Sequence, residues 1–349
     1  MKKFYKYENK GLTGLVNVGN TCYLNSCMQI LSHTYELNDL LDNINYDNLN
    51  DNEDKILISE WNDLRNLMWS QNCCISPGRF VNSVHNVSKN KNRELFCSYI
   101  QNDIQEYILF VIDTFHNSIK RKVKMNIVGS VKNDNDKMAL ECYKSYSQEF
   151  GNNYSEFIKI FFGTQVSLLR SIETNQILSI KPEPFLVLNL PLPKLNNTED
   201  KNFITIYDCL DEYCKIEILD NDNAWYNENT NKKENVNKNL IFWSLPEILI
   251  IDLKRWDFLN EYKKNNTYVD IPINDFNMNK YSYNNKFELY DLYGICNHIG
   301  DINGGHYTAY VKNANTKWYI FDDNIVNSIS ESDILSNNAY CLFYRKKKS

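Results

Sequence analysis

The chain has 349 residues and a net charge of −6, from 38 Lys and Arg against 44 Asp and Glu. Apolar residues make up 43% of it and aromatic residues 13%, which is enough to build a sizeable core and excludes global disorder. Nucleic-acid binding is disfavoured because the chain lacks the basic balance that phosphate contacts require. No apolar run approaches the roughly 18 residues of a membrane span, and the first ten residues contain no apolar signal core.

Ten cysteines without a secretion signal predict reduced thiols in the cytoplasm, the nucleus or both, and a protein that is not secreted. Asn is unusually frequent, with 53 copies. It concentrates in three stretches, Tyr46–Asp54, Val131–Lys137 and Asp220–Asn239, which we interpret as solvated loops or hairpin tips. No repeat or linker divides the chain.

The elements expected in the first half of the chain are helices. From Cys22 onwards, apolar residues recur at helical spacing, with Asn20 or Thr21 placed to cap the helix. A second helix is expected near Gln101–Lys120. The second half favours strands, at Glu247–Trp256, His306–Lys312, Lys317–Phe321 and Ala339–Arg345. Helices followed by an antiparallel sheet indicate an α+β fold.

The first candidate for chemistry is Cys22, which the pattern places in the first turn of a helix. Free backbone N–H groups and the helix dipole stabilise a thiolate there. Asn17 lies on the loop that leads into this turn, where its amide could donate to an oxyanion. Taken singly, each residue is more simply read as one buried thiol among ten and one Asn among 53.

The second candidate is a hairpin whose strands carry His306 and Asp322. If its turn centres on Ala314, these two residues face each other across the ladder, and the carboxylate can orient the imidazole. Asp323 should point to the opposite face, but a bulge would reverse that, so it remains a second candidate. Gly304 and Gly305 before the histidine permit close approach of another backbone.

Together these segments resemble the ubiquitin-specific proteases. The segment 14–26 resembles the family's cysteine box, and 290–298 with 304–323 resembles its histidine box. The stretches 101–107, 184–191 and 253–256 resemble intermediate family segments. The resemblance implies a papain-like fold with thumb, palm and fingers. It places a catalytic domain at 11–346, with the thumb at about 11–160 and the fingers and palm at about 161–346, behind a short extension at 1–10.

By resemblance, Cys22 is the nucleophile, His306 the general base, Asp322 its orienting acid and Asn17 the oxyanion donor, with Asp323 assisting. The implied reaction is hydrolysis of the peptide or isopeptide bond at the C-terminal glycine of ubiquitin, through a thioester. Asp103 and Glu106 are expected to share a helix face towards the basic ubiquitin tail. The residues expected to line the tail channel are Asp103, Gln105, Glu106, His298, Gly304, Gly305 and Tyr307. For His298, a purely structural role is an equal alternative.

The sequence departs from the family in the fingers. Many members carry a zinc site there built from two Cys-x-x-Cys pairs, but the matching stretches 171–175 and 225–229 contain no cysteine. Cys209 and Cys214 alone cannot complete a tetrahedral site. We therefore expect no metal and no cofactor. The expected partners are ubiquitin, ubiquitinated proteins and polyubiquitin chains, but neither nucleic acid nor membrane, with the protein acting as a monomer.

Two alternatives stay open at this stage. One is a catalytically silent ubiquitin-binding scaffold, although pseudoenzymes generally lose one of the three catalytic residues that are all present here. The other is a ubiquitin-like protein in place of ubiquitin. A cathepsin-type protease is not supported, because both the signal peptide and the corresponding nucleophile motif are missing.

Overall fold

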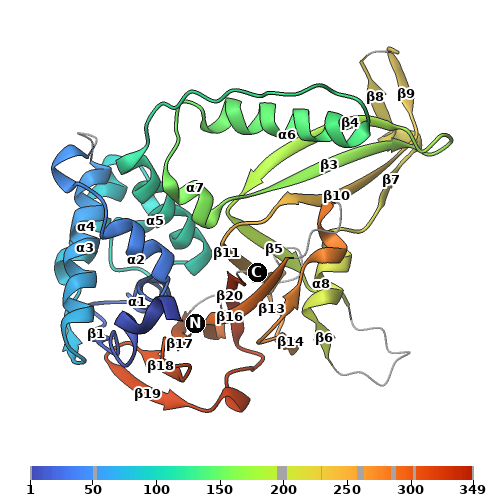
Figure 1. The fold of residues 1–349 in the computed structure, drawn as a ribbon. Coiled ribbons are helices and arrows are strands. Elements are labelled where there is room, and N and C mark those ends of the chain that lie inside the picture. The colour runs from blue at the N-terminus through green and yellow to red at the C-terminus, as the bar shows by residue number, and fades with distance from the viewer. Residues whose placement is uncertain are drawn as a thin grey trace.

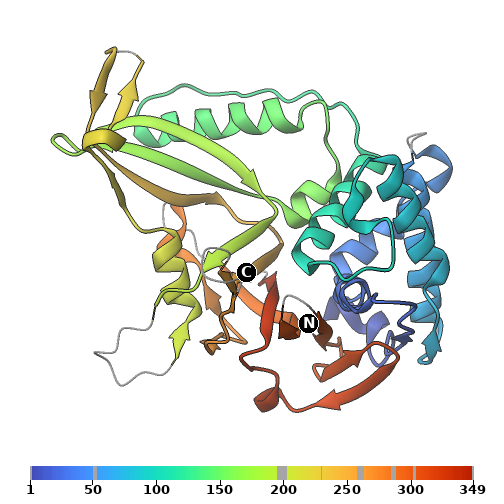
Figure 2. The ribbon, with the colours of Figure 1, turned by 180° about the vertical axis from the view of Figure 1, so that it is seen from behind.

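The computed structural model describes residues 2–49, 53–194, 203–228, 230–257, 263–283, 288–301 and 304–347. Figures 1 and 2 show a helical region at one side of a long-stranded region. The α-helices are α1 (Cys22–Ser32), α2 (Tyr35–Leu41), α3 (Asp54–Ser70), α4 (Gly78–Asn90), α5 (Ile104–Ile119), α6 (Asp134–Phe150), α7 (Glu156–Phe161) and α8 (Ile206–Tyr213). None of the described helices is both long and apolar enough to cross a bilayer.

Apart from two-residue β1 (Gly14–Leu15) and β2 (Cys74–Ile75), the strands follow the first seven helices, which confirms the α+β class. The longer strands are β3 (Gly163–Ser171), β4 (Ile177–Phe185), β5 (Val187–Pro191), β10 (Val236–Ser244), β11 (Ile248–Lys254), β16 (Leu289–Asp301), β17 (Gly304–Lys312), β18 (Trp318–Asp322), β19 (Ile325–Ile329) and β20 (Ala339–Lys346). The shorter ones are β6 (Ile204–Thr205), β7 (Glu217–Leu219), β8 (Trp225–Asn227), β9 (Lys232–Glu234), β12 (Trp256–Asp257), β13 (Lys263–Lys264), β14 (Val269–Asp270) and β15 (Phe276–Asn277).

The central sheet has the order β19-β18-β17-β16-β20-β11-β5, with β15 added on β16. Alternate residues of its inner strands enter two different cores, as strand geometry requires. On β11, Ile248 and Ile250 join the core shared with the helices, whereas Leu249 and Ile251 join the core that contains α8. The sheet is therefore covered on both faces, and the candidate site lies on its helical face.

Helix α1 is buried along its whole length, because it lies between the central sheet and the other helices. It begins at Cys22, as predicted, and Thr21 is its N-cap residue. Helix α5 begins at Ile104, three residues later than the predicted start, because the Asp103 side chain caps it. Its apolar stripe packs into the same core as α1.

The outer sheet has the order β4-β3-β10-β7 and extends away from the helical region, with the β8–β9 hairpin at its far end (Figure 1). Helix α6 runs along it in both views (Figure 2), and Met138 and Cys142 pack onto Val166 and Leu168. The predicted loop at Val131–Lys137 is wrong from Asp134 onwards, because Asn133 accepts a hydrogen bond from the Asp136 N–H and so starts α6.

The other two Asn-rich stretches fit their prediction more closely. Asp220–Asn239 contains the β8–β9 hairpin, although it also supplies the start of β10. Tyr46–Asn48 forms one 3-10 turn, and residues 50–52 lie outside the described residues.

Candidate active site

Cys22 is the first residue of α1 and is almost fully buried. The loop before it is fixed by its own polar side chains. The Asn17 Oδ1 accepts hydrogen bonds from the backbone N–H groups of Gly19 at 3.0 Å and Thr21 at 3.1 Å. Gly19 has a φ of 126°, a left-handed conformation that favours glycine, so the chain turns sharply and enters the helix at Cys22.

The surroundings of Cys22 do not favour a free thiolate, contrary to the expectation from its helix position. Burial raises the pKa of the thiol, and the negative charge of Asp323 raises it further, while backbone hydrogen bonds at Tyr307 and Tyr23 lower it. Burial dominates, so the net shift of the pKa is upward. The thiol therefore requires a base to remove its proton.

That base can be His306, whose Nε2 lies 2.6 Å from the Asp322 Oδ1. Because the His306 Nε2 is engaged in this hydrogen bond, Nδ1 is the ring nitrogen that can accept a proton. His306 is also the residue before Tyr307, whose backbone contacts the Cys22 thiol. The structure thus brings the imidazole–carboxylate pair to the strand that lies against Cys22.

The predicted register of this hairpin is wrong by one pair of residues. Lys312 pairs with Trp318 and Ala309 with Phe321, so the hairpin centres on residue 315 and not on 314. The reason is that the Asn313 N–H donates to the Lys317 carbonyl, which makes Lys317 part of the turn. His306 and Asp322 are consequently diagonal neighbours. Their shared face is kept, because the displacement along the strand is two residues.

The prediction that Asp323 points to the opposite face is wrong, because β18 ends at Asp322, Asp323 has a φ of 49°, and its carboxylate has an oxygen within 4.8 Å of ligand atoms of His306 and Asp322. Its hydrogen bonds nevertheless differ from those of Asp322. Its Oδ2 accepts from the Asn17 Nδ2 at 3.0 Å, and its Oδ1 accepts from the Asn25 Nδ2 at 2.8 Å. It therefore ties the loop before Cys22, and α1 itself, to the end of β18. One N–H of the Asn17 amide is used in this contact, and the second is left for an oxyanion.

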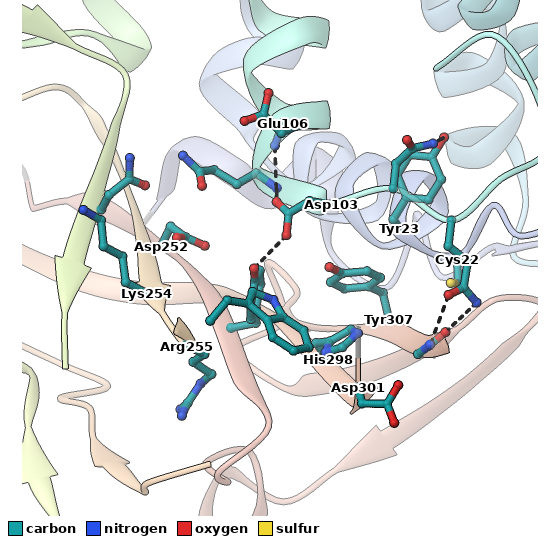
Figure 3. A pocket seen from close by; sticks show the side chains of 17 residues that line it. Cys22, Tyr23, Asp103, Glu106, Asp252, Lys254, Arg255, His298, Asp301 and Tyr307 are labelled. Atoms are coloured by element: carbon teal, nitrogen blue, oxygen red, sulfur yellow. Dashed lines mark hydrogen bonds between the residues drawn. The ribbon is translucent and has the colours of Figure 1, made fainter. Parts of the chain in front are cut away.

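A cleft of about 560 Å³ extends from Cys22 and includes all but one of the predicted tail-channel residues (Figure 3). Gly304, the exception, begins β17 beside it. The cleft is lined by Cys22, Tyr23, Gln101, Asn102, Asp103, Gln105, Glu106, Asn189, Asp252, Lys254, Arg255, Trp256, His298, Asp301, Gly305, Tyr307 and Tyr340.

Asp103 precedes α5 as its N-cap residue and does not lie within the helix as expected, but Asp103 and Glu106 both line the cleft, as predicted. The Asp103 Oδ1 accepts from the Gln105 N–H at 2.7 Å, and its Oδ2 accepts from the Tyr340 hydroxyl at 2.7 Å. The Asp103 Oδ1 therefore caps α5, and the Asp103 Oδ2 is bonded across the cleft to Tyr340. Glu106 is exposed in the first turn of α5, where the helix dipole favours a negative charge.

His298 forms a buried wall of the cleft. Burial lowers its pKa to about 4, so the ring is neutral, and it packs 4.7 Å from the Tyr307 ring, centroid to centroid. A Cβ on Gly305 would lie 2.1 Å from the His298 Nε2, so only glycine fits there. At Gly304 the corresponding space is open. The close approach predicted for the glycine pair applies to Gly305, where the neighbour is a histidine ring.

Sequence reasoning missed two groups in the cleft. Gln101 crosses it, since its Nε2 donates to the Gly305 carbonyl at 3.0 Å and its Oε1 accepts from the Gly305 N–H at 3.1 Å. Asp252 lies on the floor beside Asn189. The signal for Asp252 was available, because it is the one charged residue in the apolar run 248–253.

Among the residues that the structure describes, one group of side chains has atoms close enough to hold a metal ion, namely His306, Asp322 and Asp323, with ligand atoms within 4.8 Å of one another. These are the candidate catalytic residues themselves. At the positions expected for a zinc site in the family, the turn after β3 and strand β8 are held by hydrogen bonds, such as that from the Asn227 Nδ2 to the Glu234 Oε1 at 2.9 Å.

The family model described as "Ubiquitin carboxyl-terminal hydrolase" matches residues 13–344. Human ubiquitin carboxyl-terminal hydrolase 2 is 30% identical over 346 residues, covering 96% of this chain and 55% of the relative. The chicken protein of the same name is 32% identical over 96% of this chain and 93% of its own length.

The chain spans about half of the human relative and 35% of the fruit-fly Usp2, to which it is 31% identical. Among solved structures, the SAGA deubiquitinase module containing Ubp8, bound to ubiquitin aldehyde, superposes with a TM-score of 0.73. The sequence identity is 24%, and the match covers 98% of this chain and 71% of that chain. This likeness supports the fold.

Proposed function

The chain belongs to the ubiquitin carboxyl-terminal hydrolase family, and on that premise we propose that it is a thiol-dependent deubiquitinase. Its reaction is hydrolysis of the peptide or isopeptide bond at the C-terminal glycine of ubiquitin. The observation that carries the proposal is the contact between the Cys22 thiol and the backbone at Tyr307, next to His306 and its bond to Asp322.

The proposed reaction begins with transfer of the Cys22 proton to the His306 Nδ1. The thiolate attacks the glycine carbonyl, and the remaining N–H of the Asn17 amide donates to the oxyanion. The imidazolium, stabilised by Asp322, then protonates the departing lysine amine. Water, deprotonated by His306, cleaves the thioester and regenerates the thiol. The raised pKa of Cys22 fits this order, because a protonated thiol makes the base necessary.

The proposed substrates are ubiquitinated proteins and polyubiquitin chains, handled by a monomer in the cytoplasm, the nucleus or both. The cleft supports this choice because its acidic groups, Asp103 and Glu106, suit the basic tail Leu-Arg-Leu-Arg-Gly-Gly of ubiquitin. Its narrow wall at Gly305 suits a tail that ends in two glycines.

The test is hydrolysis of ubiquitin carrying a fluorogenic C-terminal leaving group, with matched substrates made from ubiquitin-like proteins. Cys22→Ala and His306→Ala should each abolish turnover, while Cys74→Ala, at an exposed cysteine outside the cleft, should keep it. Turnover by Cys22→Ala would overturn the assignment. Tight ubiquitin binding without turnover by the unaltered protein would favour the scaffold, and preference for another modifier would identify the true substrate.

A further inference from the structure

The floor of the cleft contains a carboxyl group without a partner. Strand β11 is buried and apolar from Ile248 to Leu253 except at Asp252, whose exposed fraction is 3%. The Asp252 Oδ1 is buried and has no hydrogen-bond partner among the described residues. An unsatisfied polar atom of this kind costs free energy, so its retention in a strand core calls for a ligand.

A second unsatisfied acceptor lies beside it. Asn189 on β5 is the registered partner of Asp252 in the parallel pair β5–β11, so the two side chains project from the same face. The Asn189 Oδ1 is also buried without a partner, and both residues line the cleft. Figure 3 shows Asp252 between Lys254 and Asp103, with its carboxyl group turned towards Asp103.

The charged and titratable groups around Asp252 come from three further elements and its own strand. They are Asp103 before α5, Tyr307 on β17, Tyr340 and Cys341 on β20, and Lys254 with Arg255 after it. Burial and the charge of Asp103 raise the pKa of Asp252 well above its usual value, against the opposing effect of Lys254 and Arg255. This environment favours the protonated form of the carboxyl group in the free protein.

Arg255 is not positioned to satisfy this carboxyl group. Its Nε donates to the Ala339 carbonyl at 2.6 Å, and one terminal nitrogen donates to the carbonyls of Asn265 and Thr267 at 2.8 and 2.9 Å. These bonds hold the guanidinium against the loop that follows β13. The Arg255 Nη2 is buried without a partner and Lys254 also lines the cleft, but among the described residues neither cation donates a hydrogen bond to the Asp252 carboxyl group.

We propose that Asp252 and Asn189 form the floor of a subsite that binds the guanidinium of one arginine in the substrate's C-terminal tail. The subsite rests on the proposed function and deepens it, because it would select modifiers that carry arginine at that tail position. A guanidinium has five N–H donors and no acceptor, which matches a floor built from acceptor oxygens. Asp103 extends this set towards the helical side of the cleft.

Arginine binding changes the protonation of the floor. When the guanidinium binds, the protonated form of Asp252 releases its proton to the solvent, and the resulting carboxylate pairs with the guanidinium. Charge is conserved, because the proton that leaves balances the cation that enters. Tail binding should therefore be accompanied by proton release from Asp252, a signature that a purely structural carboxyl group lacks.

The test is a double-mutant cycle between enzyme and ubiquitin. Asp252→Asn keeps the size of the side chain but cannot ionise, and each tail arginine of ubiquitin is replaced by alanine in turn. Asp252→Asn should lower kcat/KM about ten-fold or more on unaltered ubiquitin. On ubiquitin lacking one of the two arginines, the same substitution should have less than a three-fold effect. Asp270→Asn, an exposed strand carboxylate outside the cleft, is the matched control and should leave kcat/KM unchanged.

Proton release provides the second readout and does not depend on how Asp252→Asn folds. Calorimetric binding of ubiquitin to the Cys22→Ala protein, in buffers with different ionisation enthalpies, should show the released proton. Ubiquitin that lacks the relevant arginine should bind without releasing this proton. Additive effects in the cycle, or equal proton release for all three ubiquitins, would overturn the subsite alone. Absence of both cleavage and binding of ubiquitin by the unaltered protein would overturn the proposed function together with the subsite.

Discussion

The amide nitrogen of Asn17 donates to the Asp323 Oδ2 at 3.0 Å, so Asp323 holds the loop before Cys22. The preceding residue, Asp322, is hydrogen-bonded to His306. Two adjacent acidic residues thus have separate partners. Asp322 binds the imidazole, and Asp323 binds the amides of Asn17 and Asn25. Neutralising them should therefore have different consequences.

Asp322→Asn should lower kcat by about a hundred-fold or more with little change in KM, because the amide no longer fixes the His306 tautomer or stabilises the imidazolium. Asp323→Asn should have a smaller effect on kcat and should lower the melting temperature, because it disturbs the bonds to α1. Steady-state kinetics and thermal unfolding of both variants measure this. If Asp323→Asn lowered kcat more than Asp322→Asn does, Asp323 and not Asp322 would be the residue that orients His306.

The hairpin that carries His306 and Asp322 shows how far the sequence alone could go. Alternation placed His306 and Asp322 on one face, and that prediction holds because moving the centre of the turn from residue 314 to residue 315 leaves the parity of the register unchanged. Whether His306 and Asp322 lie directly opposite each other depends on which residues form the turn. The Asn313–Lys317 hydrogen bond fixes that turn, and the residue types alone do not predict this bond. Asp103 was misplaced for a similar reason, since a capping Asp and a first-turn Asp differ by one residue.

Two specific long-range contacts in the cleft were beyond prediction. Gln101 and Gly305 are 204 residues apart, and their paired bonds depend on how α5 sits against β17. The same holds for Asp252 and Asn189, which meet only because β5 and β11 are parallel neighbours. The raised pKa of Cys22 also required the packed structure, because burial outweighs the helix position that the sequence indicates.

Substitution of Glu106 is the most direct test of whether the cleft recognises the ubiquitin tail. Glu106→Lys should raise KM or lower kcat/KM for ubiquitin about ten-fold or more, and it should lower the melting temperature only slightly, because the residue is exposed and loses only its interaction with the dipole of α5. Asp103→Lys should in addition destabilise the fold by about 1 kcal/mol or more, because it removes the N-cap. Kinetics beside unfolding curves separate the two effects. Normal cleavage by Glu106→Lys would place the tail elsewhere.

Acid should weaken the fold below about pH 6.5. Burial lowers the pKa of both His33 and His298 to about 4, whereas in the unfolded chain each titrates near its ordinary value. Between these values the unfolded state binds protons that the native state excludes, so the free energy of unfolding falls as the pH falls. The expected loss at pH 5 is on the order of 2 kcal/mol per histidine.

Urea unfolding at pH 7, 6 and 5 measures this loss. His298→Gln should reduce the fall in the free energy of unfolding between pH 7 and pH 5, because it removes one of the histidines whose pKa burial lowers, a set that also includes His33, His85 and His116. A free energy of unfolding that stays constant from pH 7 to 5 would contradict the account.

Removal of metal ions should change neither activity nor melting temperature when reductant is present. The turn after β3, where the family carries zinc ligands, is closed by the Asn175 N–H donating to the Ser171 carbonyl at 3.0 Å. The outer sheet is further held by the packing of α6 onto β3. Thermal unfolding and turnover with and without a strong chelator test this expectation. Stoichiometric zinc in the purified protein would refute it.

The central claim is that Cys22 is the nucleophile that attacks the C-terminal carbonyl of ubiquitin. It is tested most directly by incubating the protein with ubiquitin that carries a C-terminal electrophile, followed by intact mass and peptide mapping. The account predicts one ubiquitin per chain, attached at Cys22, and no adduct in Cys22→Ala. No adduct with the unaltered protein, or attachment at any of the other nine cysteines, would contradict it.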